Sequence, residues 1–331
     1  MVLFRSKLTV LVAVAAITLL AHNGPFCTQA LSGTITSWGR DGDNQVSGTP
    51  SDTDFQAIAG GNRHSLALRS DGSIISWGRD VDGQVTNTPD GTGFTAVASG
   101  HSHSLALRSD GSITSWGRDG DNQVSGIPID AGFVAIAGGS GHSLALGSGG
   151  SITSWGRDIE NQVSGTPGGT GFTAIAAGYK HSLALGVDGS ITSWGRDTFH
   201  QVTDTPTDTG FTAIASGHSH SLALGSDGSI TSWGRDDYSQ VTNTPADTGF
   251  TAIAAGFGHS LALAPDGSIV SWGDDTYDQV TDKPSGPGFT AIAGGDYHGL
   301  ALIPEPSTGL LSLIGLALLQ LCRRNLRRRS S

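Results

Sequence analysis

The 331-residue chain is poor in cysteine and in the short motifs that mark common enzymes. Its two cysteines, Cys27 and Cys322, lie near opposite ends of the chain. No disulfide can therefore staple the body of the protein, and no cysteine cluster can bind a metal ion there. The chain also lacks a Walker-type phosphate loop, a Gly-x-Ser-x-Gly elbow and a His-Glu-x-x-His motif. We therefore expect no enzyme and no cofactor.

Basic residues are also scarce in the body of the chain. Of 18 Lys and Arg, two precede residue 8 and five follow residue 322, whereas all 29 Asp and Glu lie between them. The body thus holds 11 basic residues against 29 acidic ones, a net charge of −18. Such a body repels nucleic acid and anionic lipid, so we expect neither as a partner.

Glycine, by contrast, is abundant, with 50 residues, and the aromatic residues follow a strict period. Seven tryptophans and seven histidines each recur every 39 residues. A sevenfold repeat of this length predicts a ring of small β units rather than one irregular core. The tryptophans are Trp38, Trp77, Trp116, Trp155, Trp194, Trp233 and Trp272, and the histidines are His64, His103, His142, His181, His220, His259 and His298.

Each unit contains three candidate strands. In one unit these are Phe172–Ala176, His181–Leu185 and Ser190–Trp194, with alternating apolar residues in each. Asp188-Gly189 is a hairpin turn signal between the second and third strands. A ribbon of two or three strands is marginal alone, so the units must pack face to face around an axis.

The two ends of the body predict how this ring closes. The body opens with an isolated third strand, Thr34–Trp38, and finishes with a first and second strand, Phe289–Ala293 and His298–Leu302. Together these segments would complete a seventh unit. Closure would remove an open sheet edge that otherwise invites aggregation.

The repeated motif Ala-Gly-x-x-His-Ser-Leu-Ala-Leu-x-x-Asp-Gly-Ser-Ile-x-Ser-Trp-Gly resembles the regulator of chromosome condensation (RCC-type) repeat. Small departures include Gly299 in place of serine and Asp274 in place of arginine. The family's usual units are longer, and the short form is similar to the secreted bacterial propeller that inhibits β-lactamases. The resemblance implies an all-β, seven-bladed propeller over residues 31–303, with three-stranded blades and the last blade closed by the N-terminal strand.

The residues repeated in every unit indicate a framework. Each repeat histidine precedes a serine or, at 299, a glycine, but adjacent strand residues point to opposite faces, so this serine cannot readily meet its neighbouring imidazole. We expect each imidazole to bond a neighbouring backbone carbonyl. Asp41-Gly42-Asp43-Asn44 is similar to a calcium loop, but it lacks the downstream Glu. We assign no metal ligands, and calcium binding stays open.

Two windows differ between the units: the pair before each repeat histidine, and the residues four to six after each tryptophan. All four tyrosines fall in these windows. Because strands alternate in direction, both windows should share one face of the ring. Aromatic residues dominate interface hot spots, so we predict a binding surface there, although free drift of these loops would also explain the variation. The predicted binding residues are Tyr179, Lys180, Phe199, His200, Tyr238, Phe257, Tyr277, Asp296 and Tyr297.

Residues 1–30 are typical of a secretory signal peptide. Arg5 and Lys7 supply the charged start, and Leu8–Ala21 is an apolar run too short to span a bilayer comfortably. Thr28-Gln29-Ala30 offers a cleavage site, and cleavage after Ala21 is an alternative. We therefore expect an exported protein.

Residues 304–331 contain Pro304-Glu305-Pro306, the apolar stretch Gly309–Cys322 and a terminal arginine cluster. This order resembles the PEP-CTERM sorting signal of Gram-negative bacteria. The resemblance implies transient membrane insertion, processing by an exosortase-type enzyme, and a location in the cell envelope, on the surface or outside the cell. The alternative is a plain C-terminal membrane anchor, held by arginines on the cytoplasmic side.

These observations predict an exported, non-enzymatic binding or scaffold propeller. One loop face would bind a surface protein or a polysaccharide. Two alternatives stay open: a purely structural surface or matrix protein, and a secreted inhibitor or enzyme of unknown substrate.

Overall fold

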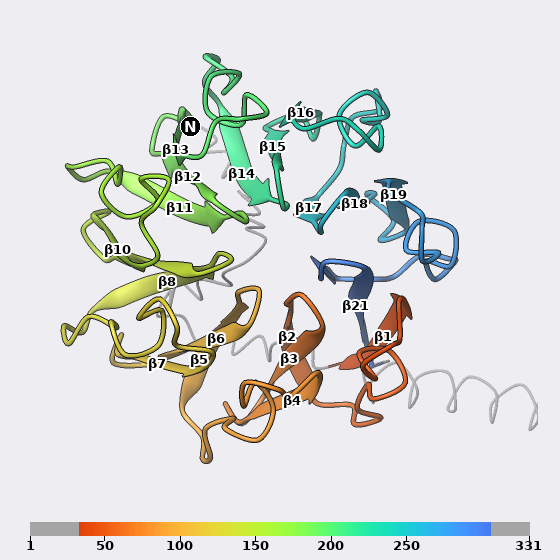
Figure 1. The fold of residues 1–331 in the computed structure, drawn as a ribbon. Coiled ribbons are helices and arrows are strands. Elements are labelled where there is room, and N and C mark those ends of the chain that lie inside the picture. Colours follow the sequence, from red (N-terminus) through yellow and green to blue (C-terminus); the bar gives the residue numbers. More distant parts are fainter. Residues whose placement is uncertain (1–32, 306–331) are drawn as a thin grey trace, which may run out of the picture.

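A computed structural model of the protein describes residues 33–305. The predicted signal peptide, and the sorting signal from Pro306 onward, lie outside these residues. The described part consists of 21 β-strands and contains no helix, and so no helix that could cross a membrane. Figure 1 shows the strands following one another around a common centre in chain order, with β21 beside β1.

The strands come in groups of three, which we call blades. The first strands are β2 (Phe55–Gly60), β5 (Phe94–Ser99), β8 (Phe133–Gly138), β11 (Phe172–Ala177), β14 (Phe211–Ser216), β17 (Ala252–Ala255) and β20 (Ala291–Gly294). The second strands are β3 (His64–Arg69), β6 (His103–Arg108), β9 (His142–Gly147), β12 (His181–Gly186), β15 (His220–Gly225), β18 (His259–Leu263) and β21 (His298–Pro304). The third strands are β4 (Ile74–Gly78), β7 (Ile113–Gly117), β10 (Ile152–Gly156), β13 (Ile191–Gly195), β16 (Ile230–Gly234), β19 (Ile269–Gly273) and β1 (Gly33–Gly39).

All strand pairings are antiparallel, and five of the sheets have three strands each. The remaining sheet has six strands in the order β20-β21-β1-β2-β3-β4. Within it, β1 pairs with β21 along its whole length, from Gly33 opposite Pro304 to Gly39 opposite His298. β1 meets β2 only through Gly33 opposite Phe55. The N-terminal strand therefore pairs with the last strand, as the sequence predicts.

The predicted strands agree with the structure to within one or two residues. Ser190 belongs to the turn, because its hydroxyl and N–H both bond to the Asp188 carboxylate. Phe289 precedes β20 instead of starting it. At the end of the body, β21 continues to Pro304, the first residue of the predicted sorting box.

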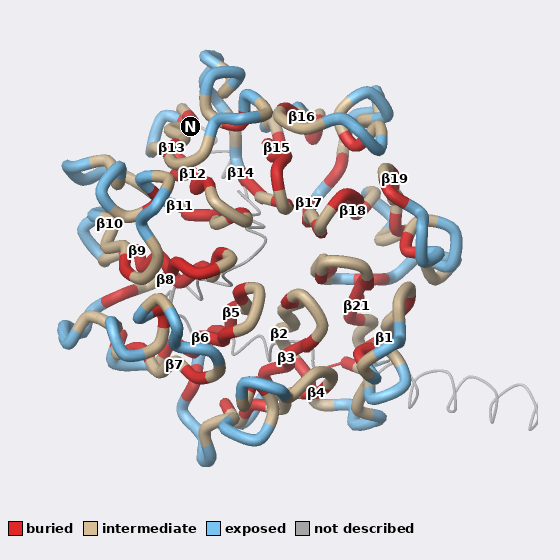
Figure 2. Tube along the Cα trace, in the orientation of Figure 1, coloured by how far each residue is buried: buried red, intermediate tan, exposed pale blue. Residues whose placement is uncertain are grey.

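The apolar core is divided into clusters that lie between consecutive blades. In one cluster, Trp155 packs with Leu105 and Ile113 of the preceding blade and with Phe133 of its own blade. Figure 2 shows this burial along the strands, with the exposed residues concentrated in the loops. Each blade thus buries its faces against its two neighbours.

The tryptophan side chains also hydrogen-bond across these gaps. We call the segment that joins the third strand of one blade to the first strand of the next a connection. Each indole N–H donates to the backbone carbonyl of a buried glutamine in the connection that leads into its own blade, at 2.9–3.0 Å. The donor and acceptor are 32 residues apart, except that Trp38 reaches Gln279 at the other end of the body. The glutamines are Gln45, Gln84, Gln123, Gln162, Gln201, Gln240 and Gln279, a period that our sequence analysis did not use.

Candidate functional site

Both variable windows lie at the same end of the blades. In the first blade, His64 at the start of β3 pairs with Gly78 at the end of β4, while the Asp71–Ser73 turn lies at the other end of these strands. The same register recurs in the other blades. We call the end with the windows the loop face and the opposite end the turn face.

Five aromatic rings form a continuous row on the loop face. Tyr179 stacks on His218 at a centroid distance of 4.0 Å, and His218 lies 4.2 Å from Phe257. Phe257 in turn stacks on Tyr297 at 5.0 Å, and Tyr277 meets the Tyr297 ring edge-on at 5.2 Å. We call these five residues the aromatic row. It brings together four of the predicted binding residues, from positions up to 118 residues apart in the chain.

A polar cluster continues the row toward the other blades. His101 lies 5.9 Å from the Tyr179 ring, and its Nε2 is 3.9 Å from Oδ2 of Asp296. The Asn62 amide donates a hydrogen bond to the same carboxylate oxygen. Burial raises the pKa of Asp296 and lowers the pKa of His101. Burial also lowers the pKa of His218 to about 3, so this imidazole is neutral at pH 7.

The other predicted residues lie beside the row and not in it. Phe199 and Tyr238 flank the guanidinium of Arg235, which is 5.0 Å from the Phe199 ring and 5.6 Å from the Tyr238 ring. Lys180 lies 3.4 Å from Glu160, and this ion pair partly neutralises it. His200 is exposed and has a left-handed φ of 61°. A positive φ is uncommon outside glycine, although asparagine, aspartate and histidine adopt it more often than other residues.

The repeat histidines make a contact that our sequence analysis predicted wrongly. In six of the seven, Nε2 bonds not to a backbone carbonyl but to the serine hydroxyl of the next blade, at 2.8–2.9 Å. Strand alternation points His and its own Ser to opposite faces, so each meets a partner across a different gap. The six pairs are His64–Ser104, His103–Ser143, His142–Ser182, His181–Ser221, His220–Ser260 and His298–Ser65.

The seventh histidine differs. His259 would face residue 299, which is glycine, and both of its ring nitrogens lack a hydrogen-bond partner. Burial lowers the pKa of His259 to about 4, and of the other six to about 3 or 4. All seven imidazoles are therefore neutral at pH 7.

A His–Ser hydrogen bond is also the geometry of a base-activated nucleophile. Here, however, the histidines and their serine partners are at most 1% exposed, so a substrate cannot reach them. Their place between blades is that of a structural bond.

The loops that are similar to calcium sites use their carboxylates internally. Oδ1 of Asp41 accepts hydrogen bonds from the N–H groups of Val46 and Ser47, at 2.9 Å each. The equivalent aspartate of every connection does the same. Within residues 33–305, no group of three or more His, Cys, Asp and Glu side chains is placed to hold a metal ion.

A small hollow lies among the inner loops of the loop face. Its lining includes Gly61, His101, Tyr179, His218 and Asp296, and its volume is about 100 Å³. Small-molecule sites usually enclose about 300–1,000 Å³. The hollow has room for a few water molecules, whereas the aromatic row forms a surface that a larger partner could contact.

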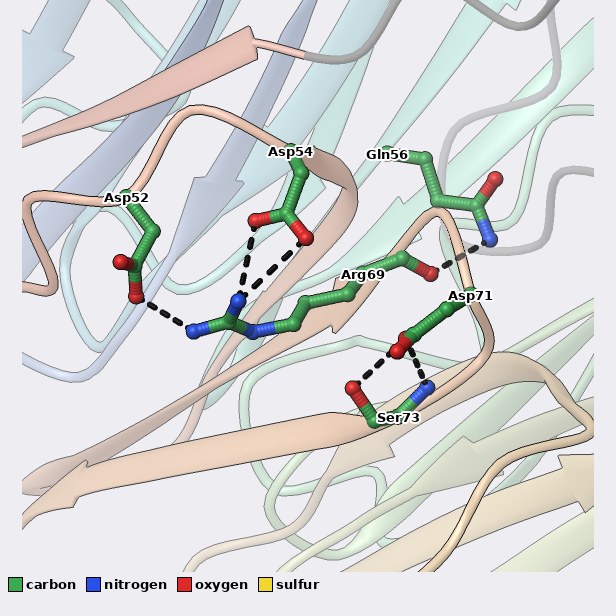
Figure 3. Close-up of polar contacts among 6 residues, drawn as sticks. All are labelled: Asp52, Asp54, Gln56, Arg69, Asp71 and Ser73. Atoms are coloured by element: carbon green, nitrogen blue, oxygen red, sulfur yellow. Dashed lines mark hydrogen bonds and ion pairs between the residues drawn. The ribbon is translucent and has the colours of Figure 1, made fainter.

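The turn face satisfies its own polar groups. Figure 3 shows Arg69 paired with Asp52 and with Asp54, at 3.2 Å from the latter. The Gln56 amide donates to the Arg69 carbonyl at 3.0 Å, and Asp71 accepts two hydrogen bonds from Ser73. This arrangement stabilises a turn, and the Arg69 guanidinium also lies 5.4 Å from the ring of the buried Phe55.

The sequence matches the family described as the regulator of chromosome condensation (RCC1) repeat at residues 55–84, 94–123, 172–201, 211–240 and 250–279. These five segments carry the pattern of the RCC1 repeat. No curated protein matches the sequence. Together with the strand groups described above, the match establishes an RCC-type β-propeller with three-stranded blades of about 39 residues.

Solved structures of RCC1-type and related propellers are similar to this chain. Prp20p from Saccharomyces cerevisiae has a TM-score of 0.68 and 20% identity, covering 88% of this chain and 95% of that one. Yeast RCC1 (Prp20) bound to Kap60 has a TM-score of 0.70 and 20% identity, covering 93% and 97%. The ectodomain of the Physcomitrella patens receptor kinase CR4 has a TM-score of 0.64 and 22% identity, covering 76% and 71%. Identities this low establish the fold alone.

Within the RCC1 repeats, our sequence analysis missed several residues of the loop face. His218 and His101 stand two residues before a repeat histidine, in the same register as Tyr179 and Phe257. This shared register could have identified them from the sequence. Arg40 lies 5.0 Å from the Tyr277 ring, but it did not stand out in the sequence because most units carry arginine at this position.

Proposed function

We propose that this protein is an exported, non-enzymatic binding scaffold that captures a partner on its loop face. The single observation that carries the proposal is the aromatic row. Tyr277, at its end, is 40% exposed, and the neighbouring Tyr238 is 39% exposed. Exposed tyrosine and arginine dominate the binding energy of protein interfaces, and contiguous apolar surface is uncommon without a partner.

We also propose that the scaffold is a closed ring of seven blades, with β20, β21 and β1 as the seventh. The pairing of β1 with β21 supports this closure. So do three contacts between the ends of the body: Trp38 with the Gln279 carbonyl, His298 with Ser65, and the Asp296 N–H with the Gly61 carbonyl at 3.0 Å. A closed ring would hold the loops of all blades in a fixed plane.

A protein is the partner class that we favour over a polysaccharide. Two contacts of the aromatic row, Tyr179 with His218 and Phe257 with Tyr297, are stacked, so these ring faces are covered and their edges remain for contact. A sugar ring would need an open aromatic face. Among similar structures, Prp20p is described with binding to Gsp1p and histones, and yeast RCC1 is bound to Kap60. These relatives support a protein partner by analogy of fold.

The non-enzymatic role is part of the proposal. The buried His–Ser pairs and the small central hollow support it, because neither offers a reactive group together with room for a substrate. Export and surface location rest on the sequence of the two ends, including Leu8–Ala21 and the Pro304-Glu305-Pro306 box.

Affinity capture from a native cell-envelope and matrix fraction tests the binding role. The full chain is compared with a variant in which Tyr179, Phe257 and Tyr297 are replaced by alanine. We expect one defined protein to be retained by the parent and lost from the variant.

A matched control replaces exposed apolar residues away from the loop face, Val187→Ala and Ile129→Ala, and should retain the same protein. Equal retention by the parent and the triple variant, or retention of nothing, would leave the purely structural alternative in front. Retained sugar without protein would favour the polysaccharide partner.

A further inference from the structure

On the loop face, an arginine stands two residues after six of the seven tryptophans. Six of the seven connections carry this arginine, and the seventh carries Asp274. The arginines are Arg40, Arg79, Arg118, Arg157, Arg196 and Arg235.

Where the preceding connection presents an aromatic ring, this arginine lies next to it. The Arg235 guanidinium is 5.0 Å from the ring of Phe199, and the Arg40 guanidinium is 5.0 Å from the ring of Tyr277. Phe199 has a second guanidinium nearby, from Arg196 of its own connection, at 5.9 Å. In these two gaps, the loop face therefore places a guanidinium group against an aromatic ring.

Tyr238 is the aromatic residue for which this arrangement is incomplete. Arg235 of its own connection lies 5.6 Å from the ring, but the position in the next connection is Asp274. Both residues border Gly258: a Cβ on this glycine would lie 2.8 Å from Cδ2 of Tyr238 and 3.1 Å from Cβ of Asp274. An aromatic ring, a glycine and a carboxylate thus meet in this gap. The two neighbouring gaps place an arginine, Arg235 or Arg40, at the position of Asp274.

The Asp274 carboxylate has unused binding capacity. Asp274 is only 4% exposed, and its Oδ1 accepts hydrogen bonds from the N–H and hydroxyl of Thr276 at 3.0 and 2.5 Å. No ion pair with Asp274 is present among residues 33–305. A buried carboxylate without a counter-ion strongly favours an arriving cation.

We propose that Tyr238, Gly258 and Asp274 form a cation seat that binds the guanidinium of an arginine side chain from the partner protein. A guanidinium stacks on aromatic faces and pairs with carboxylates in a plane, and both groups stand here together. The same group already occupies the corresponding place beside Phe199 and Tyr277. The inference rests on the proposed function in one respect: the partner must be a protein, because a protein supplies the arginine.

An NMR titration of the isotope-labelled full chain with Nα-acetyl-arginine amide tests the cation seat directly. We expect saturable shifts of the Gly258 amide and of the Tyr238 ring signals. A single side chain binds weakly, so the Kd should be on the order of 10 mM. Nα-acetyl-citrulline amide, which has nearly the same shape without the charge, should bind at least about tenfold more weakly.

The matched variant is Asp274→Arg, which restores the residue found in the six other connections and so fits the repeat. It should fill the seat with its own guanidinium and abolish the shifts. Asp274→Asn keeps the shape of the side chain, removes the charge and should weaken binding at least about tenfold, so it provides the contrast even if Asp274→Arg folds poorly.

Absence of shifts at roughly tenfold the expected Kd, or equal shifts with the citrulline compound or with Asp274→Asn, would overturn the cation seat. Because the probe is a small molecule, this result is independent of partner capture. Capture that depends on the aromatic row, without arginine binding here, would leave the proposed function standing and remove only the seat.

Discussion

The tryptophans between the blades and the aromatic residues of the loop face belong to one chemical class but occupy opposite environments. The seven tryptophans are 4–6% exposed, and each donates its N–H to a glutamine carbonyl across the gap. Tyr238 and Tyr277 are about 40% exposed and contact arginines. The tryptophans recur at every 39th residue in all seven units, whereas among the loop tyrosines only Tyr238 and Tyr277 are 39 residues apart.

This difference separates the residues that hold the blades together from the residues that are available for binding. A side chain present in every unit must fill the same gap between blades each time, so its environment is fixed by the packing of adjacent blades. A side chain present in one unit can vary without disturbing the other gaps. Aromatic residues that occur in only some of the units, on the loop face, are therefore free to serve binding. Four predictions test this contrast, from the largest expected effect to the smallest.

Acid should unfold the protein cooperatively between about pH 4 and pH 6. The seven repeat histidines have pKa values of about 3 or 4 in the folded state because burial disfavours the imidazolium, against 6.5 in an unfolded chain. The unfolded state therefore binds more protons, so stability is complete above about pH 6.5 and falls as the pH drops toward the folded values. At pH 5, each histidine would cost about 2 kcal/mol, and seven together exceed about 10 kcal/mol, which matches the whole stability of many domains.

Circular dichroism and tryptophan fluorescence across a pH series check this prediction. The slope of the transition should report the uptake of several protons. Aspartates with lowered pKa, such as Asp71, stabilise the fold above pH 3.8 and lose that effect only below it, in a separate window. A midpoint below pH 3, or the uptake of a single proton, would show that the histidines do not limit stability.

Trp155→Ala should destabilise the protein by about 3–5 kcal/mol, as for other large-to-small core changes. It opens a cavity between two blades and leaves the Gln123 carbonyl without its donor. Urea unfolding followed by circular dichroism measures the loss. A variant as stable as the parent would show that the tryptophans do not hold the blades together.

Ser143→Ala should cost about 1–3 kcal/mol, because it leaves the buried Nε2 of His103 without a partner. The gap at His259 already lacks this bond, yet Gly299→Ser should not repair it. A Cβ on Gly299 would lie 2.2 Å from Cζ2 of the buried Trp38. We expect overpacking to offset the new hydrogen bond, so thermal unfolding should show no gain in stability. A clear gain would mean that the missing serine is a simple defect.

Tyr238→Ala should change the free energy of unfolding by less than about 1 kcal/mol, because the side chain lies at the surface. The same urea series as for Trp155→Ala measures it under identical conditions. If the two substitutions cost the same, the division between framework and loop aromatics would be wrong.

The period of the sequence predicted the strands well because each strand depends on local alternation and on turn residues such as Asp188-Gly189. It also predicted which loops share a face, since antiparallel strands leave no other choice. It did not predict that His103 bonds to Ser143, because the partner lies 40 residues away on another blade. Nor did it predict the stacking order of the aromatic row, which depends on how the loops of neighbouring blades are placed relative to one another.

The sequence by itself determined the repeated three-stranded unit, the residues that repeat and the loops that differ. These features follow from backbone geometry and from side-chain periodicity within one unit. Only the tertiary structure decided which residues meet across the gaps: His with the next Ser, Trp with the preceding Gln carbonyl, and Tyr179 with His218. Such contacts depend on the distance and rotation between blades, which the packing of whole sheets sets and no single unit encodes.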